Sequence, residues 1–197
     1  MSFFTSQFGH PTGLLGQLVG TIMAYQNRER NHWAVALLDI QAGDHVLEIG
    51  FGPGLAIQEA ARLASNGLFA GVDTSEVMLR QAHRRSAAAV RAGRVDLRLG
   101  SAMALPFPDG AFDKAFATNS LHHWPDPAAG LRELRRVLKP GGLVAIIEQP
   151  RGSATDAQVQ ALADQRAAQL AEAGFREMRL EFKPMRPAAS VGVLGIR

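Results

Sequence analysis

Residues 46 to 54 read Val-Leu-Glu-Ile-Gly-Phe-Gly-Pro-Gly, and this stretch decides the fold. Residues 46–49 are typical of a short buried strand, glycines follow at positions 50, 52 and 54, and an apolar helical pattern begins at Leu55. In such a strand–turn–helix unit, backbone N–H groups at the helix N-terminus can approach a ligand closely. Glycine suits the turn because a Cβ atom would block the approach or forbid the turn's φ angles.

The glycine spacing excludes one common ligand. A dinucleotide-binding turn has the pattern G-x-G-x-x-G, which would place its third glycine at position 55, where this chain has Leu55. Glu48, two residues ahead of the first glycine, also suits a cationic ligand better than a pyrophosphate. The turn therefore indicates a ligand that carries positive charge.

Strands and helices alternate along the chain after the glycine turn. This alternation predicts right-handed βαβ units around a mostly parallel, seven-stranded sheet, which is a doubly wound α/β fold. The last two strands have only residues 183–189 between them, too few for a helical crossover, so the last strand must run antiparallel. The predicted strands cover residues 45–50, 68–73, 94–99, 112–118, 143–148, 175–182 and 190–196, and the predicted helices cover residues 14–26, 31–38, 55–64, 75–91, 127–138 and 155–173.

Composition narrows the class of protein further. A chain of 197 residues fits one domain, which we divide into an N-terminal helical cap (1–42) and the α/β core (43–197). The absence of cysteine excludes disulfides, thiolate metal sites and cysteine nucleophiles. No apolar run is long enough to span a membrane and the first residues lack the basic start of a signal peptide, so we expect a cytoplasmic protein. The net charge is only +3, and we interpret the arginines between positions 62 and 98 as solvated surface rather than a nucleic-acid site.

Asp73 is a candidate ribose-binding residue. It follows the second predicted strand and lies nineteen residues beyond Gly54, where a doubly wound nucleotide fold places a carboxylate that binds a ribose diol. Its two oxygens can accept hydrogen bonds from both hydroxyls. The alternative role is the N-cap of the next helix, which Ser75 can fill instead.

Five ordered motifs resemble those of the class I S-adenosylmethionine (SAM)-dependent methyltransferases. They are the glycine turn, Gly71-x-Asp73-x-Ser75-x-x-Met78-Leu79, Leu105-Pro106-Phe107-Pro108-Asp109-x-x-Phe112-Asp113, Leu121-His122-His123-Trp124-x-Asp126 and Leu138-Lys139-Pro140-Gly141-Gly142. The resemblance covers residues 44–148 and points to the small-molecule enzymes, among them the ubiquinone/menaquinone and the sterol or natural-product methyltransferases. It implies a Rossmann-like fold with SAM as cofactor.

The resemblance also implies roles for single residues. The backbone around Gly50 and Gly52 would meet the methionine part of SAM, and Asp73 would bind the ribose. Met78 would pack on the adenine, whose edge would meet the Ser101-Ala102 turn, although the family usually has aspartate where this chain has Ser101. We expect weaker adenine anchoring without that charge. The cofactor's amino-acid end would bind Asn119, and the full set of expected cofactor residues is Tyr25, Glu48, Gly50, Gly52, Gly54, Asp73, Thr74, Met78, Ser101, Ala102 and Asn119.

His122 and His123 have two alternative interpretations. A metal site is not expected, because adjacent side chains diverge and no third ligand stands nearby in the sequence. In related O-methyltransferases the first histidine of such a pair works with an acid at the end of strand five, where this chain has Glu148. His122 would then remove a hydroxyl proton while Glu148 orients it. The alternative is that the pair only packs in a turn.

The acceptor cover is expected to come from the first forty residues. Only residues 149–153 separate strand five from the next helix, so no lid fits there, and the aromatic and apolar residues of the cap suit an apolar acceptor: Phe3, Phe4, Phe8, Leu14, Leu15, Tyr25 and Trp33. Most of them can equally pack onto the sheet, while the Tyr25 hydroxyl could reach the cofactor carboxylate. Apolar surface near a thin cap also suggests a homodimer.

The sequence thus predicts SAM-dependent methyl transfer to a small, fairly apolar acceptor, at oxygen first and carbon next. The alternative is a protein that keeps the fold and the cofactor site without methylating, such as a cyclase, an isomerase or a partner subunit. An RNA methyltransferase ranks third, because only the arginine content favours it and no RNA-binding module is evident.

Overall fold

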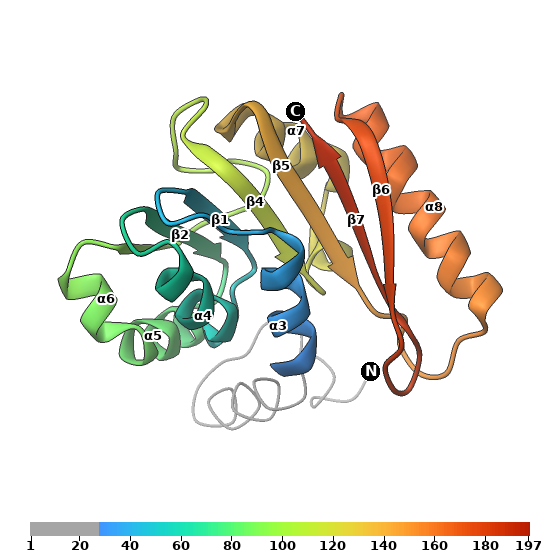
Figure 1. Cartoon of the computed structure of the whole chain (residues 1–197), viewed down its shortest axis with the longest axis horizontal. Coiled ribbons are helices and arrows are strands. Elements are labelled where there is room, and N and C mark those ends of the chain that lie inside the picture. Colours follow the sequence, from blue (N-terminus) through green and yellow to red (C-terminus); the bar gives the residue numbers. More distant parts are fainter. Residues whose placement is uncertain (1–27) are drawn as a thin grey trace.

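The computed structural model describes residues 28–197, which form a seven-stranded sheet with helices on both faces (Figure 1). The strand order is β3-β2-β1-β4-β5-β7-β6; β1 to β5 pair in parallel, and β7 runs antiparallel to both β5 and β6. This confirms the predicted fold. The strands are β1 (His45–Ile49), β2 (Leu68–Asp73), β3 (Val95–Leu99), β4 (Phe112–Thr118), β5 (Leu138–Glu148), β6 (Arg176–Lys183) and β7 (Ser190–Ile196).

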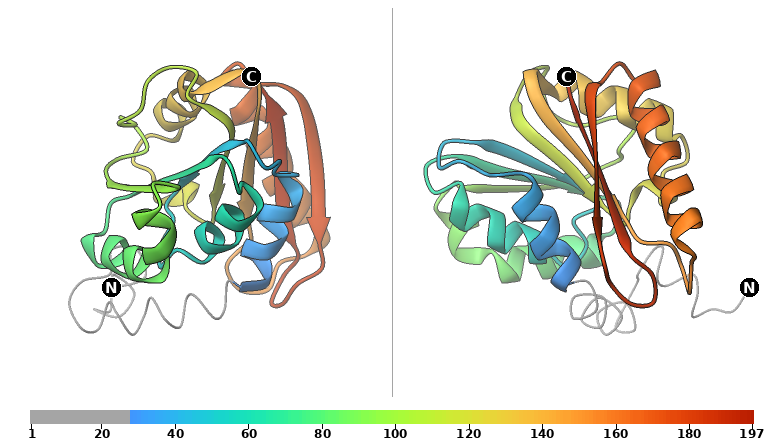
Figure 2. Two further views of the ribbon diagram at one scale, coloured as in Figure 1. Left: turned by 60° about the vertical axis from the view of Figure 1, so that its left-hand side comes forward. Right: turned by 45° about the vertical axis from the view of Figure 1, so that its right-hand side comes forward.

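Helices cover the sheet in two layers. Helices α3, α4 and α5 pack on one face, and α7 and α8 pack on the other (Figure 2). Alternate strand residues face opposite layers: Val46 belongs to the hydrophobic cluster under α3 and α4, and Leu47 to the cluster under α7 and α8. The helices are α3 (Arg28–Leu37), α4 (Leu55–Leu63), α5 (Glu76–Arg85), α6 (Ala87–Arg91), α7 (Pro127–Val137) and α8 (Asp156–Glu172), with a 3-10 turn at Leu121–His123.

The largest differences from the predicted element boundaries are at α5, α3 and β5. The single helix expected over 75–91 is broken at Ser86, which ends α5 and precedes α6. The helix expected over 31–38 already includes Arg28 and ends at Leu37. Strand β5 begins at Leu138 rather than 143, because residues 139–142 bulge between two registers of pairing with β4. The predicted helix 14–26, Tyr25 and the aromatic cap residues before it lie outside the described residues.

One edge of the sheet gathers the residues of interest. Because β1, β2, β4 and β5 are parallel, their carboxyl ends meet at this edge, and the turn between β6 and β7 lies there too, since Glu148 pairs with Val191 and Lys183 with Ser190. The strand order reverses between β1 and β4, which is where open α/β sheets bind ligands.

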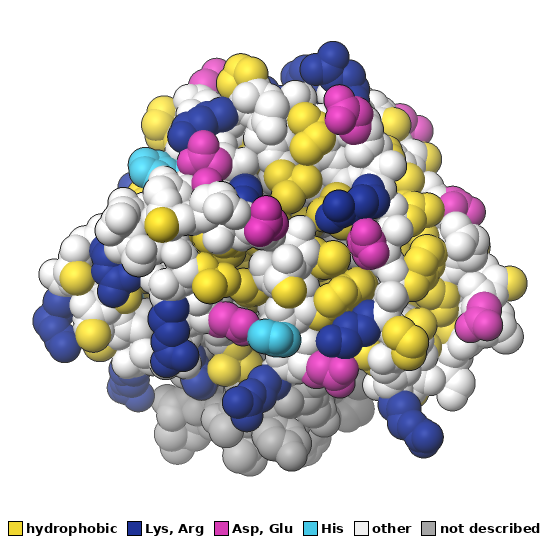
Figure 3. All heavy atoms as spheres, in the orientation of Figure 1, with side chains coloured by type: hydrophobic (Ala, Val, Ile, Leu, Met, Phe, Trp, Pro, Cys, Tyr) yellow, Lys and Arg dark blue, Asp and Glu magenta, His cyan; other side chains and the backbone are white. Residues whose placement is uncertain are grey.

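Surface charge is mixed on the face that carries α3 and β7. Figure 3 shows acidic and basic side chains interspersed there. In the arginine-rich stretch, Arg80 pairs with Glu76 and Arg98 with Asp96. The interpretation of these arginines as solvated surface stays a prediction. Within residues 28–197, no helix is both long and apolar enough to cross a membrane.

Candidate active site

The three glycines after β1 meet different neighbours. Gly50 has a φ of +75°, and a Cβ atom there would lie 2.5 Å from the Ser120 Cβ, because β1 and the residues after β4 pack closely. Gly52 has a φ of +53° with nothing within 4 Å of a Cβ position, so its backbone conformation favours glycine and leaves its surroundings open to a ligand. A Cβ atom at Gly54 would lie 2.7 Å from that of Ala82, where α4 packs on α5.

Asp73 ties the glycine turn to the end of β2. One carboxylate oxygen accepts a hydrogen bond from the Gly52 N–H and the other accepts one from the Ser75 N–H, both at 2.8 Å. A carboxylate is an acceptor at both of its oxygens, which suits the two hydroxyls of a ribose diol. Ser75 is the N-cap of α5, as its hydroxyl accepts from the Met78 N–H. The helix-capping role therefore belongs to Ser75, as the sequence suggested.

Glu48 brings a buried carboxyl to the same turn. The residue is 3% exposed, and its Oε2 has no hydrogen-bond partner in the described part of the chain. Burial, and then the negative charge of Asp73, raise the pKa of Glu48 to about 8. A cation beside this buried acid would favour its ionised form, and SAM carries positive charge on its sulfonium and its ammonium group. The two carboxyl groups at the turn therefore fit a ligand with a ribose and a positive charge, as SAM has.

The expected adenine-side residues lie near the ends of β2 and β3. Thr74 is exposed, whereas Met78 is 2% exposed and belongs to the cluster under α3 and α4. The Ser101 hydroxyl accepts a hydrogen bond from the Met103 N–H at 3.2 Å, which closes the turn that contains the buried Ala102. Contacts between these residues and adenine stay predictions.

Asn119 occupies the strand end beside the glycine turn. Its φ of +50° is one that asparagine tolerates better than most residues. Its Oδ1 accepts a hydrogen bond from the Gln149 N–H at 2.9 Å, which joins the ends of β4 and β5. The side-chain amide N–H groups are the donors it can offer a carboxylate.

His122 and Glu148 meet as the sequence predicted. The Nδ1 atom of His122 lies 3.1 Å from Glu148 Oε1, with the side chains 32% and 4% exposed. Arg166 Nε donates to the other oxygen of Glu148 at 2.5 Å. Burial alone would raise the pKa of Glu148, but the hydrogen bond from His122 and the charge of Arg166 outweigh it and hold that pKa below its usual range. Glu148 is therefore an anion that accepts from both partners.

Two arginines that contact the His122–Glu148 pair were not predicted from the sequence. Arg166 lies on α8 among the buried positions Val159, Ala163 and Leu170, at helical spacing. A charged residue on an apolar stripe requires a buried partner of opposite charge, and that signal could have found it. Arg151 follows β5, and its Nη2 lies 3.3 Å from His122 Nε2. No periodic pattern marks Arg151.

The side chains of His122 and His123 do not diverge, contrary to what their adjacency suggested. The two rings touch, with centroids 4.1 Å apart and a tilt of 47°. The carboxylate of Glu148 is bonded to His122. The structure thus brings together His122 and Glu148, the pair that the family resemblance singled out.

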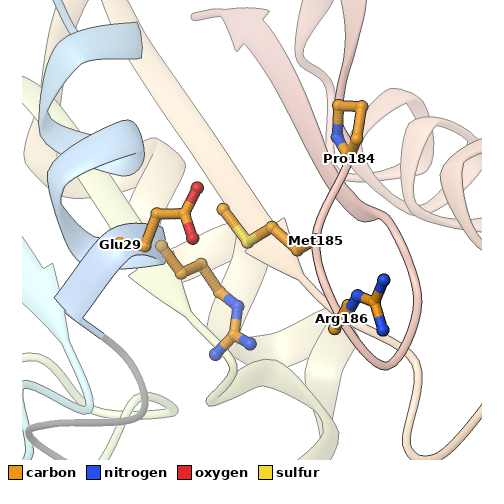
Figure 4. A pocket seen from close by; sticks show the side chains of 5 residues that line it. Glu29, Pro184, Met185 and Arg186 are labelled. Carbon is orange, nitrogen blue, oxygen red and sulfur yellow. The ribbon is translucent and has the colours of Figure 1, made fainter.

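A pocket of about 600 Å³ opens at the same sheet edge, between α3 and the β6–β7 turn (Figure 4). Gln149 connects its walls, because its side chain bonds to the Arg30 guanidinium and to the Arg186 carbonyl oxygen. Trp33, expected as a cover residue, instead packs near Gly192 on β7. The pocket is lined by Glu29, Arg30, Pro184, Met185 and Arg186.

Known proteins resemble this chain in sequence. The sequence profile of the methyltransferase domain family matches residues 47–146. The uncharacterized methyltransferase YdaC of Bacillus subtilis is 36% identical over 175 residues, which cover 88% of this chain and 94% of that protein. The demethylmenaquinone methyltransferase of Symbiobacterium thermophilum is 40% identical over 115 residues, or 58% of this chain and 46% of that protein.

A solved structure extends the likeness to the fold. The SAM-dependent methyltransferase from Aquifex aeolicus superposes with a TM-score of 0.73 at 20% identity, over 91% of this chain and 97% of that one. By contrast, the match to the menaquinone enzyme spans less than half of that enzyme's length.

Proposed function

This chain belongs to the methyltransferase domain family and uses SAM as its methyl donor, and we propose that it methylates an oxygen atom of a small, fairly apolar acceptor. Similarity to a demethylmenaquinone methyltransferase supports a small-molecule acceptor. One observation carries the choice of oxygen: the His122 imidazole is bonded through Nδ1 to the buried Glu148, and its Nε2 lies 3.3 Å from the exposed Arg151 side chain, which a hydroxyl would replace. A base is useful where the nucleophile is protonated.

We propose the following division of the cofactor site. Asp73 accepts hydrogen bonds from the ribose hydroxyls through its two carboxylate oxygens, which the Gly52 and Ser75 N–H groups hold in place. Glu48 faces the positive charge at the methionine end, where Gly52 leaves room for the ligand. Adenine contacts Met78 and the 101–102 turn, and the amino-acid end meets the Asn119 amide and the Tyr25 hydroxyl. Tyr25 lies outside the described residues and rests on the sequence alone.

The reaction requires a deprotonated oxygen in line with a methyl group. SAM supplies that methyl group in activated form on a sulfonium sulfur. His122 Nε2 removes the hydroxyl proton, while Glu148 holds the Nδ1 proton and fixes the orientation of the ring. Arg166 is a positioning residue that keeps Glu148 ionised and oriented. Holding the two reacting atoms together provides much of the remaining rate.

The two histidines provide the test, since they are adjacent and His122 is bonded to Glu148. Turnover is measured by mass spectrometry of S-adenosylhomocysteine with 1-naphthol as the acceptor. We expect His122→Ala to lower turnover by about a hundredfold or more with unchanged SAM affinity. His123→Ala, the matched control, should affect mainly stability. Equal and modest losses in both variants would mean that the pair is structural.

The same assay separates the rival function. A cyclase, an isomerase or a partner subunit on this fold would bind SAM without consuming it. Such a protein would leave SAM intact in the presence of every hydroxylated acceptor tested, whereas a methyltransferase releases one S-adenosylhomocysteine for each methylated product.

A further inference from the structure

Arg151 lies where the acceptor's reacting oxygen has to bind. Its Nη2 is 3.3 Å from His122 Nε2, on the side of the ring away from Glu148. A guanidinium group donates hydrogen bonds and accepts none. His122 Nε2 must therefore carry the lone pair in this contact, and the proton sits on Nδ1, which donates to Glu148.

This arrangement defines the position of the acceptor. A hydroxyl that gives its proton to His122 Nε2 must place its oxygen about 2.6–3.2 Å from that nitrogen. Arg151 already occupies that hydrogen-bonding direction. When the acceptor oxygen replaces Arg151 on Nε2, the guanidinium N–H groups lie within reach of the same oxygen. Arg151 is exposed and belongs to the short segment after β5, next to Gly152, whose φ is +70°.

The charge of the cluster favours an anion at this position. Glu148 is ionised and pairs with Arg166, which leaves the Arg151 charge beside a neutral His122. A positive charge close to the oxygen stabilises the oxyanion that forms as the proton leaves. The benefit is large for phenols and enols, which ionise readily, and small for alkyl alcohols, which react without a developed oxyanion.

We propose that Arg151 binds the acceptor oxygen as an oxyanion, so that the substrates of this enzyme are acidic hydroxyl compounds such as phenols, naphthols or enols. The inference rests on the proposed O-methylation and names its substrate class. In the step, the O–H proton passes to His122 Nε2 and the oxygen forms a bond to the methyl carbon. The carbon–sulfur bond breaks with its electron pair going to sulfur, and the imidazolium then loses its proton to water.

The test uses 4-nitrophenol, whose phenolate has its own visible absorption. Full-length protein is saturated with S-adenosylhomocysteine and titrated with 4-nitrophenol at a pH equal to the pKa of the free phenol. We expect the bound phenol to be mostly phenolate, and Arg151→Met to weaken phenolate binding by about tenfold or more. The phenolate affinity of Arg151→Lys should lie between those of the wild type and Arg151→Met, because lysine keeps the positive charge without the planar donor fork.

Arg132→Met is the matched control, because Arg132 is an exposed arginine on α7 outside this cluster. The control should bind phenolate as the wild type does. Equal phenolate binding by wild type and Arg151→Met, or no phenolate binding by the wild type, would overturn the proposal.

The phenolate-binding test of Arg151 can fail or succeed independently of the turnover test of His122. His122→Ala should still bind phenolate, because Arg151 remains, while losing turnover. If His122→Ala kept full turnover but Arg151→Met lost phenolate binding, the base assignment would fail and the oxyanion site would stand. If His122→Ala lost turnover but Arg151→Met still bound phenolate as the wild type does, the role of His122 as base would stand and the oxyanion site would be rejected.

Discussion

Glu48 allows a measurement on the protein without cofactor. Its carboxyl is buried beside Asp73, and its pKa is raised from 4.5 to about 8 by burial first and by the Asp73 charge second. The folded protein therefore holds Glu48 protonated at neutral pH, whereas the unfolded chain ionises it above pH 4.5. The unfolded state binds fewer protons between these two values, so the free energy of unfolding falls as pH rises through this window.

The size of the effect follows from the two pKa values. Each pH unit between 4.5 and about 8 removes about 1.4 kcal/mol of stability. The loss is absent below pH 4.5, reaches about 5 kcal/mol near pH 8 and stays level above it. Glutamine has nearly the same shape and does not titrate. The stability of Glu48→Gln relative to wild type should therefore rise by this amount between pH 4.5 and 8.

Urea unfolding of wild type and Glu48→Gln, followed by tryptophan fluorescence at several pH values from 5 to 8, measures the difference. Glu172→Gln is the control, because Glu172 is exposed at the end of α8. Saturating SAM should reduce the pH dependence of the wild type, since a cation beside Glu48 favours its ionised form. A stability difference between wild type and Glu48→Gln that is the same at all pH values would refute the reasoning.

Three further predictions concern the cofactor, the acid–base pair and the assembly. Asp73→Ala should weaken SAM binding by about 2–3 kcal/mol in calorimetry, because a charge-assisted pair of hydrogen bonds to the ribose is lost; unchanged affinity in a folded variant would reject the assignment. Arg166→Met should raise the pKa of Glu148 and move the acidic limb of the kcat–pH profile to higher pH, with Arg166→Lys restoring much of the wild-type profile; superimposable profiles would show that Arg166 only packs. The homodimer expected from the thin cap should appear in light scattering at micromolar concentration, and monomer alone would contradict it.

Local sequence signals predicted the order of the elements and the glycine turn well. The glycine turn is a local unit: an apolar strand, three glycines at alternate positions and the following helix are adjacent in the sequence. The position of Asp73 after the second strand follows from the same βαβ geometry. The connection between the last two strands is too short for a helical crossover, and this was enough to predict that β6 and β7 pair in antiparallel orientation. The break at Ser86 and the early start of β5 were not predicted, because both depend on how a segment packs against its neighbours.

The contact between His122 and Glu148 was predicted because a family resemblance supplied the pairing. His122 and Glu148 are 26 residues apart, and their contact depends on the parallel order of β4 and β5. Arg166 could have been noticed as a charge on an apolar helix stripe, but its partner follows only from the position of α8 over the sheet. The contact between Arg151 and His122 joins a short loop to a 3-10 turn and has no local signature.

The most direct test of oxygen methylation is the position of the transferred methyl group. SAM labelled with carbon-13 in its methyl group is incubated with the enzyme and 1-naphthol, and the product is examined by NMR. If oxygen is the methylated atom, we expect a methyl ether signal that forms with the wild type and whose rate of formation falls by about a hundredfold or more with His122→Ala. A methyl group bonded to ring carbon, or an ether formed equally fast without His122, would contradict this expectation.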